Sequence, residues 1–160
     1  MEILIVAVGR LKRAPEAELC TAYLERASRT GRTAGLGKIA IREIPESRAQ
    51  RAPERKAQEA AQIAAAVPAG YQRVCLDEAG DLKNSRDLKM IIGRRLDDGM
   101  PGLAFLIGGP DGLDAGLVSG CDLSLSFGRL TWPHRLVRVM LAEQIYRVMT
   151  MLTGHPYHRE

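Results

Sequence analysis

The chain has 160 residues, of which 46% are hydrophobic and only 4% are aromatic. This length suits one globular domain with a single core, and so few aromatic residues argue against a sheet on which several RNA bases stack. The net charge is +4, and with five lysines among the 23 basic residues the remaining 18 are arginines. Guanidinium groups suit phosphate, so this excess of arginine indicates either an RNA partner or only coding bias.

The cysteines and the first apolar run indicate where the protein works. Cys20, Cys75 and Cys121 are far apart without a C-x-x-C spacing, so we expect unpaired, buried thiols in a reducing compartment and no zinc site. The run from Ile3 to Val8 follows acidic Glu2, which predicts a first strand and not a signal peptide. No run is long enough to cross a membrane. The sequence therefore predicts a cytoplasmic protein with no membrane partner.

The predicted elements alternate between strands and helices along the whole chain. Strands are expected at residues 2–9, 37–44, 71–77, 103–107 and 123–126. Helices are expected at residues 15–30, 53–67, 85–96, 114–119 and 135–153. The second strand alternates apolar and polar residues and should lie at an edge or be half-exposed. Such alternation predicts an α/β fold of one domain, a parallel sheet with helices on both faces.

Two connections are unusually polar. Residues 45–52 contain Arg48 and Arg51 but no apolar side chain that would anchor them, so we expect this segment to be disordered or to wait for a partner. Residues 77–80, with the sequence Asp-Glu-Ala-Gly, predict a turn at the carboxyl end of the third strand.

The last predicted helix has apolar residues around much more than the usual third of its circumference. The sheet of a chain this short covers one face of such a helix, so we predict that a second subunit covers another, through a two-fold contact. The alternative is a central helix that is wrapped within one chain.

Ligands of open parallel sheets bind at the carboxyl ends of the strands. Here the loops at those ends begin at Leu76, Gly108 and Phe127. The Gly108-Gly-Pro-Asp-Gly112 turn lets a ligand approach the backbone closely, although an ordinary turn has the same composition. Neither G-x-x-x-x-G-K-[ST] nor G-x-G-x-x-G is present, which argues against Walker-type ATP binding and against dinucleotide binding.

All three histidines, His134, His155 and His158, lie in the final segment. Tyr157, His158 and Arg159 combine a phenol, a group that titrates near neutrality and a fixed cation, a set suited to gripping and deprotonating a substrate. The alternative is a surface tail that caps the last helix. A metal site is not expected, because no acidic or cysteine ligand accompanies the histidines at a suitable spacing.

Several motifs in order resemble one known family. They are LIGGPDG at residues 106–112, LTWPH at 130–134, LVRV at 136–139, AEQIYR at 142–147 and HPYHRE at 155–160. Together with Ile5-Val-Ala-Val-Gly9 they resemble the bacterial RlmH methyltransferases of the SPOUT superfamily, over the whole chain. The resemblance implies a homodimer with a C-terminal trefoil knot that binds S-adenosylmethionine (SAM). It also implies methylation of N3 of a pseudouridine in 23S ribosomal RNA, on the assembled ribosome.

The resemblance also implies site residues. The cofactor positions would be Leu76, Gly108, Gly109, Phe127, Gly128, Arg129, Leu130, Thr131 and Trp132. Trp132 stands where a smaller aliphatic residue is expected. The proton on N3 needs an acceptor, for which the candidates are His158, His134, Tyr157 and Glu143. Arginines that would hold the RNA backbone or the developing charge are Arg138, Arg159, Arg48, Arg51 and Arg55.

Two other functions fit the same residues. One is a non-catalytic, dimeric factor that binds the ribosome or assists its assembly, and it would need neither the glycine-rich loop nor Tyr157, His158 and Arg159. The other is a SPOUT methyltransferase that acts on another RNA, such as tRNA.

Overall fold

The computed structural model of the chain describes residues 1–157. The strands are β1 (Glu2–Val8), β2 (Ile39–Ile44), β3 (Gln72–Leu82), β4 (Gly102–Ile107) and β5 (Leu123–Ser126). The helices are α1 (Pro15–Gly31), α2 (Ala52–Ala66), α3 (Ser85–Asp97), α4 (Ala115–Ser119) and α5 (His134–Thr153), and a 3-10 turn, η1 (Arg32–Ala34), follows α1. The predicted alternation of strands and helices is therefore confirmed.

The five strands form one parallel sheet in the order β2-β1-β4-β3-β5. All six residues of β4 are buried, as expected of a central strand with helices on both faces. β2 lies at the edge and exposes Ile41, Arg42 and Glu43, as its alternating sequence predicted. The sheet order is compatible with the knot that the resemblance implies, and the knot itself stays a prediction.

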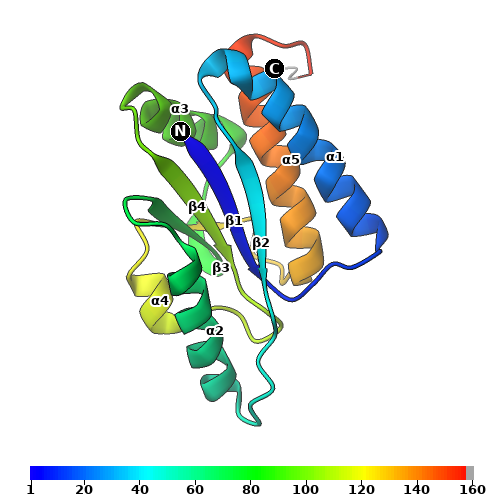
Figure 1. Cartoon of the computed structure of the whole chain (residues 1–160), viewed down its shortest axis with the longest axis vertical. Coiled ribbons are helices and arrows are strands. Elements are labelled where there is room, and N and C mark those ends of the chain that lie inside the picture. Colours follow the sequence, from blue (N-terminus) through cyan, green and yellow to red (C-terminus); the bar gives the residue numbers. More distant parts are fainter. Residues whose placement is uncertain (158–160) are drawn as a thin grey trace.

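Helices cover both faces of the sheet (Figure 1). On one face α5 lies between α1 and α3, and the three helices share a core with β1, β3 and β4 that includes Ile5, Phe105 and Ile145. On the other face α2 and α4 pack on a second core that includes Val6 and Ile63. The predicted fold class is confirmed, and the carboxyl ends of the strands meet at one edge.

The third strand differs from the prediction. A turn was expected at residues 77–80, but β3 continues to Leu82 through a register shift between Leu76 and Asp81. Gly80 permits this path, because a Cβ atom there would lie 2.7 Å from the backbone carbon of Leu125. The extra residues bulge out next to β5, which places them at the carboxyl edge of the sheet.

Helix α5 is largely covered within its own chain. Ile145, Val148 and Met149 are fully buried, because α1 and α3 flank the helix in addition to the sheet below it. The breadth of its apolar surface therefore does not require a second subunit, contrary to the reasoning from sequence. Leu136, near the start of the helix, remains 40% exposed. Between residues 1 and 157, no helix is long and apolar enough to cross a bilayer.

The cysteines also differ from the prediction. Cys75 and Cys121 form a disulfide that joins β3 to the segment before β5, so the expectation of three unpaired thiols is wrong. Only their proximity in the fold reveals the pairing, since 46 residues separate them in sequence. Cys20 is unpaired and buried, as expected.

Polar contacts hold the connection between β2 and α2. The Ser47 amide donates to Glu59 Oε1 at 2.9 Å, and its hydroxyl donates to Gln58 Oε1 at 2.6 Å. The Arg55 guanidinium donates to the carbonyl oxygens of Ala49 and Gln50. These polar anchors replace the apolar ones that the segment lacks, so the alternative of a disordered segment is wrong.

Candidate functional site

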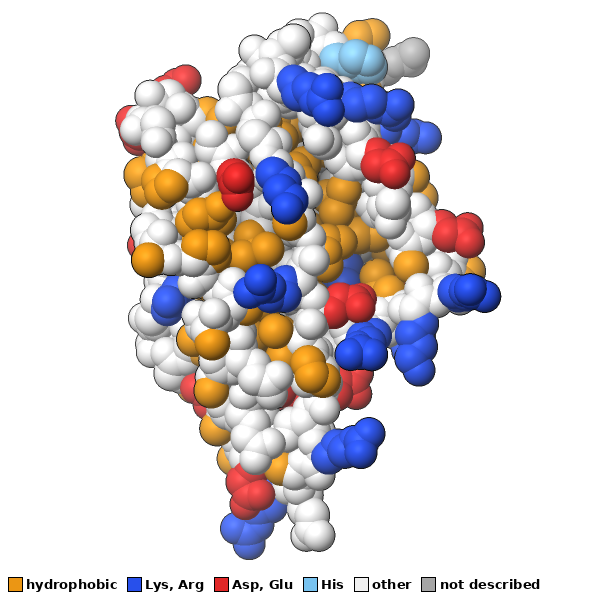
Figure 2. All heavy atoms as spheres, in the orientation of Figure 1, with side chains coloured by type: hydrophobic (Ala, Val, Ile, Leu, Met, Phe, Trp, Pro, Cys, Tyr) orange, Lys and Arg blue, Asp and Glu red, His pale blue; other side chains and the backbone are white. Residues whose placement is uncertain are grey.

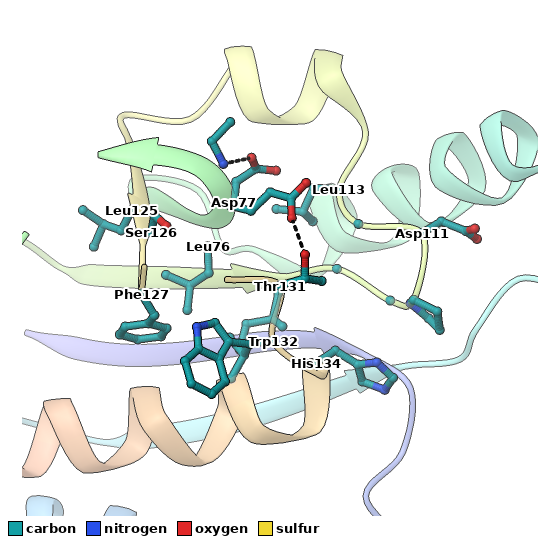
Figure 3. A pocket seen from close by; sticks show the side chains of 18 of the residues that line it. Leu76, Asp77, Asp111, Leu113, Leu125, Ser126, Phe127, Thr131, Trp132 and His134 are labelled. Atoms are coloured by element: carbon teal, nitrogen blue, oxygen red, sulfur yellow. Dashed lines mark hydrogen bonds between the residues drawn. The ribbon is translucent and has the colours of Figure 1, made fainter. Parts of the chain in front are cut away.

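A cleft of about 420 Å³ lies at the carboxyl edge of the sheet, within the roughly 300–1,000 Å³ typical of small-molecule sites. Its walls are three segments: residues 76–79 after the main part of β3, residues 107–113 after β4, and residues 125–132 around the end of β5. Figure 3 shows Leu76, Phe127 and Trp132 around this space. The predicted convergence of three strand-end loops is confirmed.

The glycine-rich loop after β4 is folded tightly on itself. A Cβ atom on Gly108 would lie 2.6 Å from the Gly112 carbonyl carbon, and one on Gly109 would lie 2.9 Å from Val8 Cγ1. Gly112 has φ +80°, and its amide donates to the Gly109 carbonyl at 3.0 Å. Side chains at Gly108 or Gly109 would displace this wall, because the atoms that they meet belong to the loop and to β1.

An ion pair ties this loop to α2. Arg55 Nε donates to Asp111 Oδ2 at 2.7 Å, and Arg55 Nη2 donates to Oδ1 at 3.0 Å. The hydrogen bond from Arg55 holds the pKa of Asp111 below its ordinary value. With Nη1 also bound to two backbone carbonyls, Arg55 positions the loop. These contacts engage four of its five N–H donors, and its role in RNA binding stays a prediction.

A second turn forms the wall after β5. Ser126 Oγ donates to the Gly128 carbonyl at 2.8 Å and accepts from the Gly128 amide at 3.2 Å. Gly128 has φ +137°, which side chains rarely adopt. Phe127 packs against the core, whereas Leu130 and Trp132 at the mouth are 70% and 39% exposed. Of the predicted cofactor positions, Arg129 alone is absent from the cleft lining.

Acidic residues that the sequence analysis did not select form the third wall. The register shift in β3 brings Asp77 and Glu78 into the cleft lining. Glu78 Oε2 accepts from Thr131 Oγ1 at 3.2 Å, which joins this wall to the turn after β5 (Figure 3). Carboxylates directly after a strand bind ribose hydroxyls in other nucleotide sites, and this signal could have identified the pair. Lys56 and Val137 also line the cleft.

Among the candidate bases within residues 1–157, His134, the first residue of α5, is the one that lines the cleft. Burial lowers the pKa of its imidazole, and the nearby Arg138 guanidinium lowers it further, against a smaller opposing effect of Glu46. The ring is therefore neutral at physiological pH and has a nitrogen lone pair that accepts a proton. A neutral imidazole that lines the cleft is suited to accept a proton from a substrate.

Acidification should weaken the fold through His134. The unfolded chain takes up this proton near the ordinary pKa of about 6.5, and the folded chain takes it up only at lower pH. The free energy of unfolding should therefore fall as the pH falls through 6.5, and His134→Gln should remove part of that fall. Urea unfolding at pH 7.5 and 5.5 measures it, with His155→Gln, an exposed histidine, as control. Equal pH dependence in wild type and His134→Gln would refute this assignment.

Arg138 lies in the interior of the protein and not on its surface. It is fully buried, and its Nη1 atom lies 3.0 Å from Glu43 Oε1. Its Nη2 atom donates to the carbonyl oxygens of Val8 and Gly9. The guanidinium thus ties the start of α5 to the ends of β1 and β2. The prediction that Arg138 contacts RNA is wrong, because water and RNA cannot reach it.

Two other predicted catalytic residues lie outside the cleft. The Tyr157 hydroxyl donates to Glu143 Oε1 at 3.2 Å, and its ring packs on Tyr146 at 4.6 Å between centroids. Glu143 also accepts from Arg147 at 2.6 Å. Burial and the Glu143 charge raise the pKa of Tyr157 to about 12, so its phenol stays protonated. Neither group can serve this chain's own cleft. His158 and Arg159 lie outside the described residues.

The described residues after α5, which end at Tyr157, lie far from the cleft of the same chain. α5 begins at His134 and runs for 20 residues to Thr153, and Tyr157 follows that end of the helix. A helix of that length spans about 30 Å. In Figure 1 the described end of the chain lies at the upper end of α5, opposite the strand-end loops.

The cleft has the chemistry of a nucleoside-cofactor site. Apolar Leu76 and Phe127 offer surface to a flat ring, and Asp77 and Glu78 offer acceptors to hydroxyl or amino groups. The turn at Gly128 leaves room for a ligand against the backbone, because the nearest atom to an added Cβ there is Trp132 Nε1 at 3.9 Å, whereas Gly108 is packed against its own loop. The residues present therefore fit S-adenosylmethionine. Within residues 1–157, no group of three or more His, Cys, Asp or Glu is arranged to hold a metal ion.

Comparisons with known proteins agree with this reading. The family model described as "Predicted SPOUT methyltransferase" matches residues 1–158. A ribosomal RNA large subunit methyltransferase H of Methylocella silvestris is 46% identical over 160 residues, with 100% of both chains covered. A protein of the same name from Rhodopseudomonas palustris is 51% identical over 159 residues, with 99% of both chains covered.

Solved structures resemble the fold at low sequence identity. A probable methylase family protein from Haemophilus influenzae has a TM-score of 0.52 and 11% identity, with 99% of this chain and 70% of that chain covered. A probable methyltransferase from Bordetella pertussis has a TM-score of 0.50 and 13% identity, with 92% and 95% covered. At these identities the likeness concerns the fold.

Proposed function

Because the chain belongs to the SPOUT methyltransferases, within the group named ribosomal RNA large subunit methyltransferase H, we propose that it methylates N3 of a pseudouridine in 23S ribosomal RNA. The methyl donor is S-adenosylmethionine, and the acceptor is the assembled ribosome. The observation that carries this proposal is the cleft where the three strand-end loops meet around Gly108 and Gly128. A ribosome-bound assembly factor that catalyses no reaction would not need such a cleft.

S-adenosylmethionine supplies a methyl group activated by a positively charged sulfur. The residues that would hold it are Leu76, Gly108 and Gly109 and the turn from Phe127 to Trp132, with Asp77 and Glu78 as polar partners. These walls are fixed before any ligand binds, by the Arg55–Asp111 pair and the Thr131–Glu78 bond. Preformed positioning of this kind supplies much of the rate gain in a group transfer.

The chain's own contribution to proton movement is assigned to His134. N3 of pseudouridine carries a proton that must leave when the N–C bond forms. A neutral imidazole at the cleft accepts it at Nδ1 or Nε2, and the lowered pKa of His134 keeps that form dominant at neutral pH. Removing the imidazole should therefore lower turnover more than it lowers SAM affinity.

The homodimer belongs to the proposal as well. Tyr157, the residue before His158, lies at the end of α5 that is remote from its own chain's cleft. If His158 and Arg159 take part in the chemistry, they must therefore do so in the cleft of another subunit. A two-fold dimer would bring each tail to the partner's cleft. The exposed Leu136 near the start of α5, together with Leu130 and Trp132 at the cleft mouth, offers apolar surface beside that cleft.

Mixing two inactive subunits tests the shared site. One variant ends at Gly154, and the other carries Gly108→Val. We expect each to be inactive alone, and the mixture to recover up to about a quarter of wild-type methyl transfer, because random pairing places one intact cleft beside one intact tail in half of the dimers. No recovery, with mixed dimers shown by mass, would place the complete site in one subunit.

Methyl transfer to different RNAs tests the substrate. Labelled SAM is supplied with intact ribosomes, separated subunits or tRNA, all from cells that lack the activity. Label on intact ribosomes, lost when the target uridine is not isomerised, is the expected result. Label on tRNA would point to the other methyltransferase function, and binding to ribosomes without any label or SAM affinity would point to a non-catalytic factor.

A further inference from the structure

The connection between β1 and α1 presents three unpaired cations beside the cleft. Arg10, Lys12 and Arg13 are exposed, and within residues 1–157 their side chains form no ion pair or hydrogen bond. A Cβ atom on Gly9 would lie 3.5 Å from His134 Nε2, so the connection starts next to a residue of the cleft. Figure 2 shows Lys and Arg side chains at the lower right, over the connections that follow β1 and β2.

This connection is anchored, so it is not a loose basic loop. Leu11 is only 6% exposed and packs with Cys20 and Ala142. Its amide donates to Glu43 Oε1 at 2.9 Å. The Gly9 carbonyl accepts from the buried guanidinium of Arg138 at 2.8 Å. The backbone is therefore fixed between the core and β2, and the three cations project from a rigid base.

The backbone at Lys12 is strained. Lys12 has φ +46° and is the one non-glycine residue within residues 1–157 with positive φ. Glycine adopts this conformation without steric cost, and lysine does not. Strain that a simple substitution would relieve points to a role for the side chain itself. The strain at Lys12 is evidence separate from the presence of three unpaired cations.

We propose that the β1–α1 connection is a phosphate-contact site, in which Arg10, Lys12 and Arg13 hold the RNA backbone so that the target nucleotide reaches the cleft. This rests on the proposed function and adds a binding surface to it. Three unpaired cations on a fixed backbone match the spaced negative charges of a polynucleotide. Of the two acidic groups beside this connection, Glu43 is paired with Arg138, and the exposed Glu46 lies next to Gly9 on the His134 side.

Salt dependence of binding tests the proposal. The variant carries Arg10→Gln, Lys12→Gln and Arg13→Gln. The matched control carries Arg29→Gln, Arg32→Gln and Lys38→Gln, exposed cations at the opposite edge of the sheet. Both lower the formal net charge from +4 to +1. For large ribosomal subunits that lack the modification, the loop variant should bind roughly tenfold to a hundredfold more weakly, with a log–log salt slope shallower by about 2–3.

The single variant Lys12→Gly separates binding from folding. Because glycine relieves the strain, this variant should melt at the same or a higher temperature and still bind ribosomal subunits more weakly, with unchanged SAM affinity. Equal weakening by the control triple, or an unchanged salt slope in the loop triple, would overturn the proposal. If wild type transfers no methyl group at all, the proposed function fails, while the slopes of the two triples still decide whether this connection holds RNA.

Discussion

Gly108→Val should abolish SAM binding, with a loss of at least about 100-fold, or about 2.7 kcal/mol. A Cβ atom at Gly108 would lie 2.6 Å from the carbonyl carbon of Gly112 and 2.8 Å from the amide nitrogen of Leu113. These are backbone atoms, so the whole loop must move and one wall of the cleft moves with it. A wall displaced in this way no longer fits the cofactor, so the contacts that would hold it are lost. Isothermal titration with SAM measures the affinity.

The control for this variant is Gly120→Ala. Gly120 follows α4 with φ −89°, and a Cβ atom there would meet its nearest neighbour at 3.5 Å, an ordinary contact. Its SAM affinity should equal that of wild type. The thermal midpoint of Gly108→Val shows whether the protein is still folded, and Gly108→Ala provides a milder substitution. Wild-type SAM affinity in a folded Gly108→Val variant would show that the loop does not form the cofactor site.

Arg138→Met should lower the free energy of unfolding by about 3 kcal/mol and the thermal midpoint by roughly 6–12 °C. The substitution leaves the carbonyls of Val8 and Gly9 without a donor and Glu43 without its cation. The Glu43 side chain is 33% exposed, so water partly replaces the lost partner and the cost stays at the lower end of the range for buried pairs. Urea unfolding measures it.

A double-mutant cycle separates the ion pair from the other contacts of Arg138. Glu43→Gln keeps the acceptor for the Leu11 amide and removes the charge. The double variant should then lose less stability than the sum of the two single losses, by about 1–3 kcal/mol. Arg135→Met, which removes an exposed arginine of the same helix, is the matched control and should be nearly neutral. A neutral Arg138→Met variant would contradict the structural role.

The sequence predicted the fold well because its signals are local. Each strand is a short apolar run bounded by turn residues, and each helix has a start or stop signal, such as the Asn84 cap of α3. A parallel sheet then forces the ends of β3, β4 and β5 to one edge. For this reason the meeting of Leu76, Gly108 and Phe127 followed from the sequence alone, before any side-chain contact was known.

The errors concern residues whose roles depend on distant contacts. Arginine in an amphipathic position looks like a surface cation, yet the Arg138 guanidinium is bound by three acceptors, on β1 (Val8), just after β1 (Gly9) and on β2 (Glu43). Tyr157 looks like a catalytic phenol, yet it lies against Tyr146 and Glu143. The Asp77–Gly80 segment has the composition of a turn, and only its fit beside Leu125 makes it part of a strand. No local pattern encodes these partners.

The identity of the methylated nucleoside tests the central claim most directly. Ribosomes from cells that lack the activity are incubated with the protein and SAM, and their 23S RNA is digested to nucleosides for mass spectrometry. We expect one additional N3-methylpseudouridine per 23S molecule, absent with Gly108→Val and at the wild-type level with Gly120→Ala. A methyl group on any other nucleoside, or none on the RNA of fully active ribosomes, would contradict it.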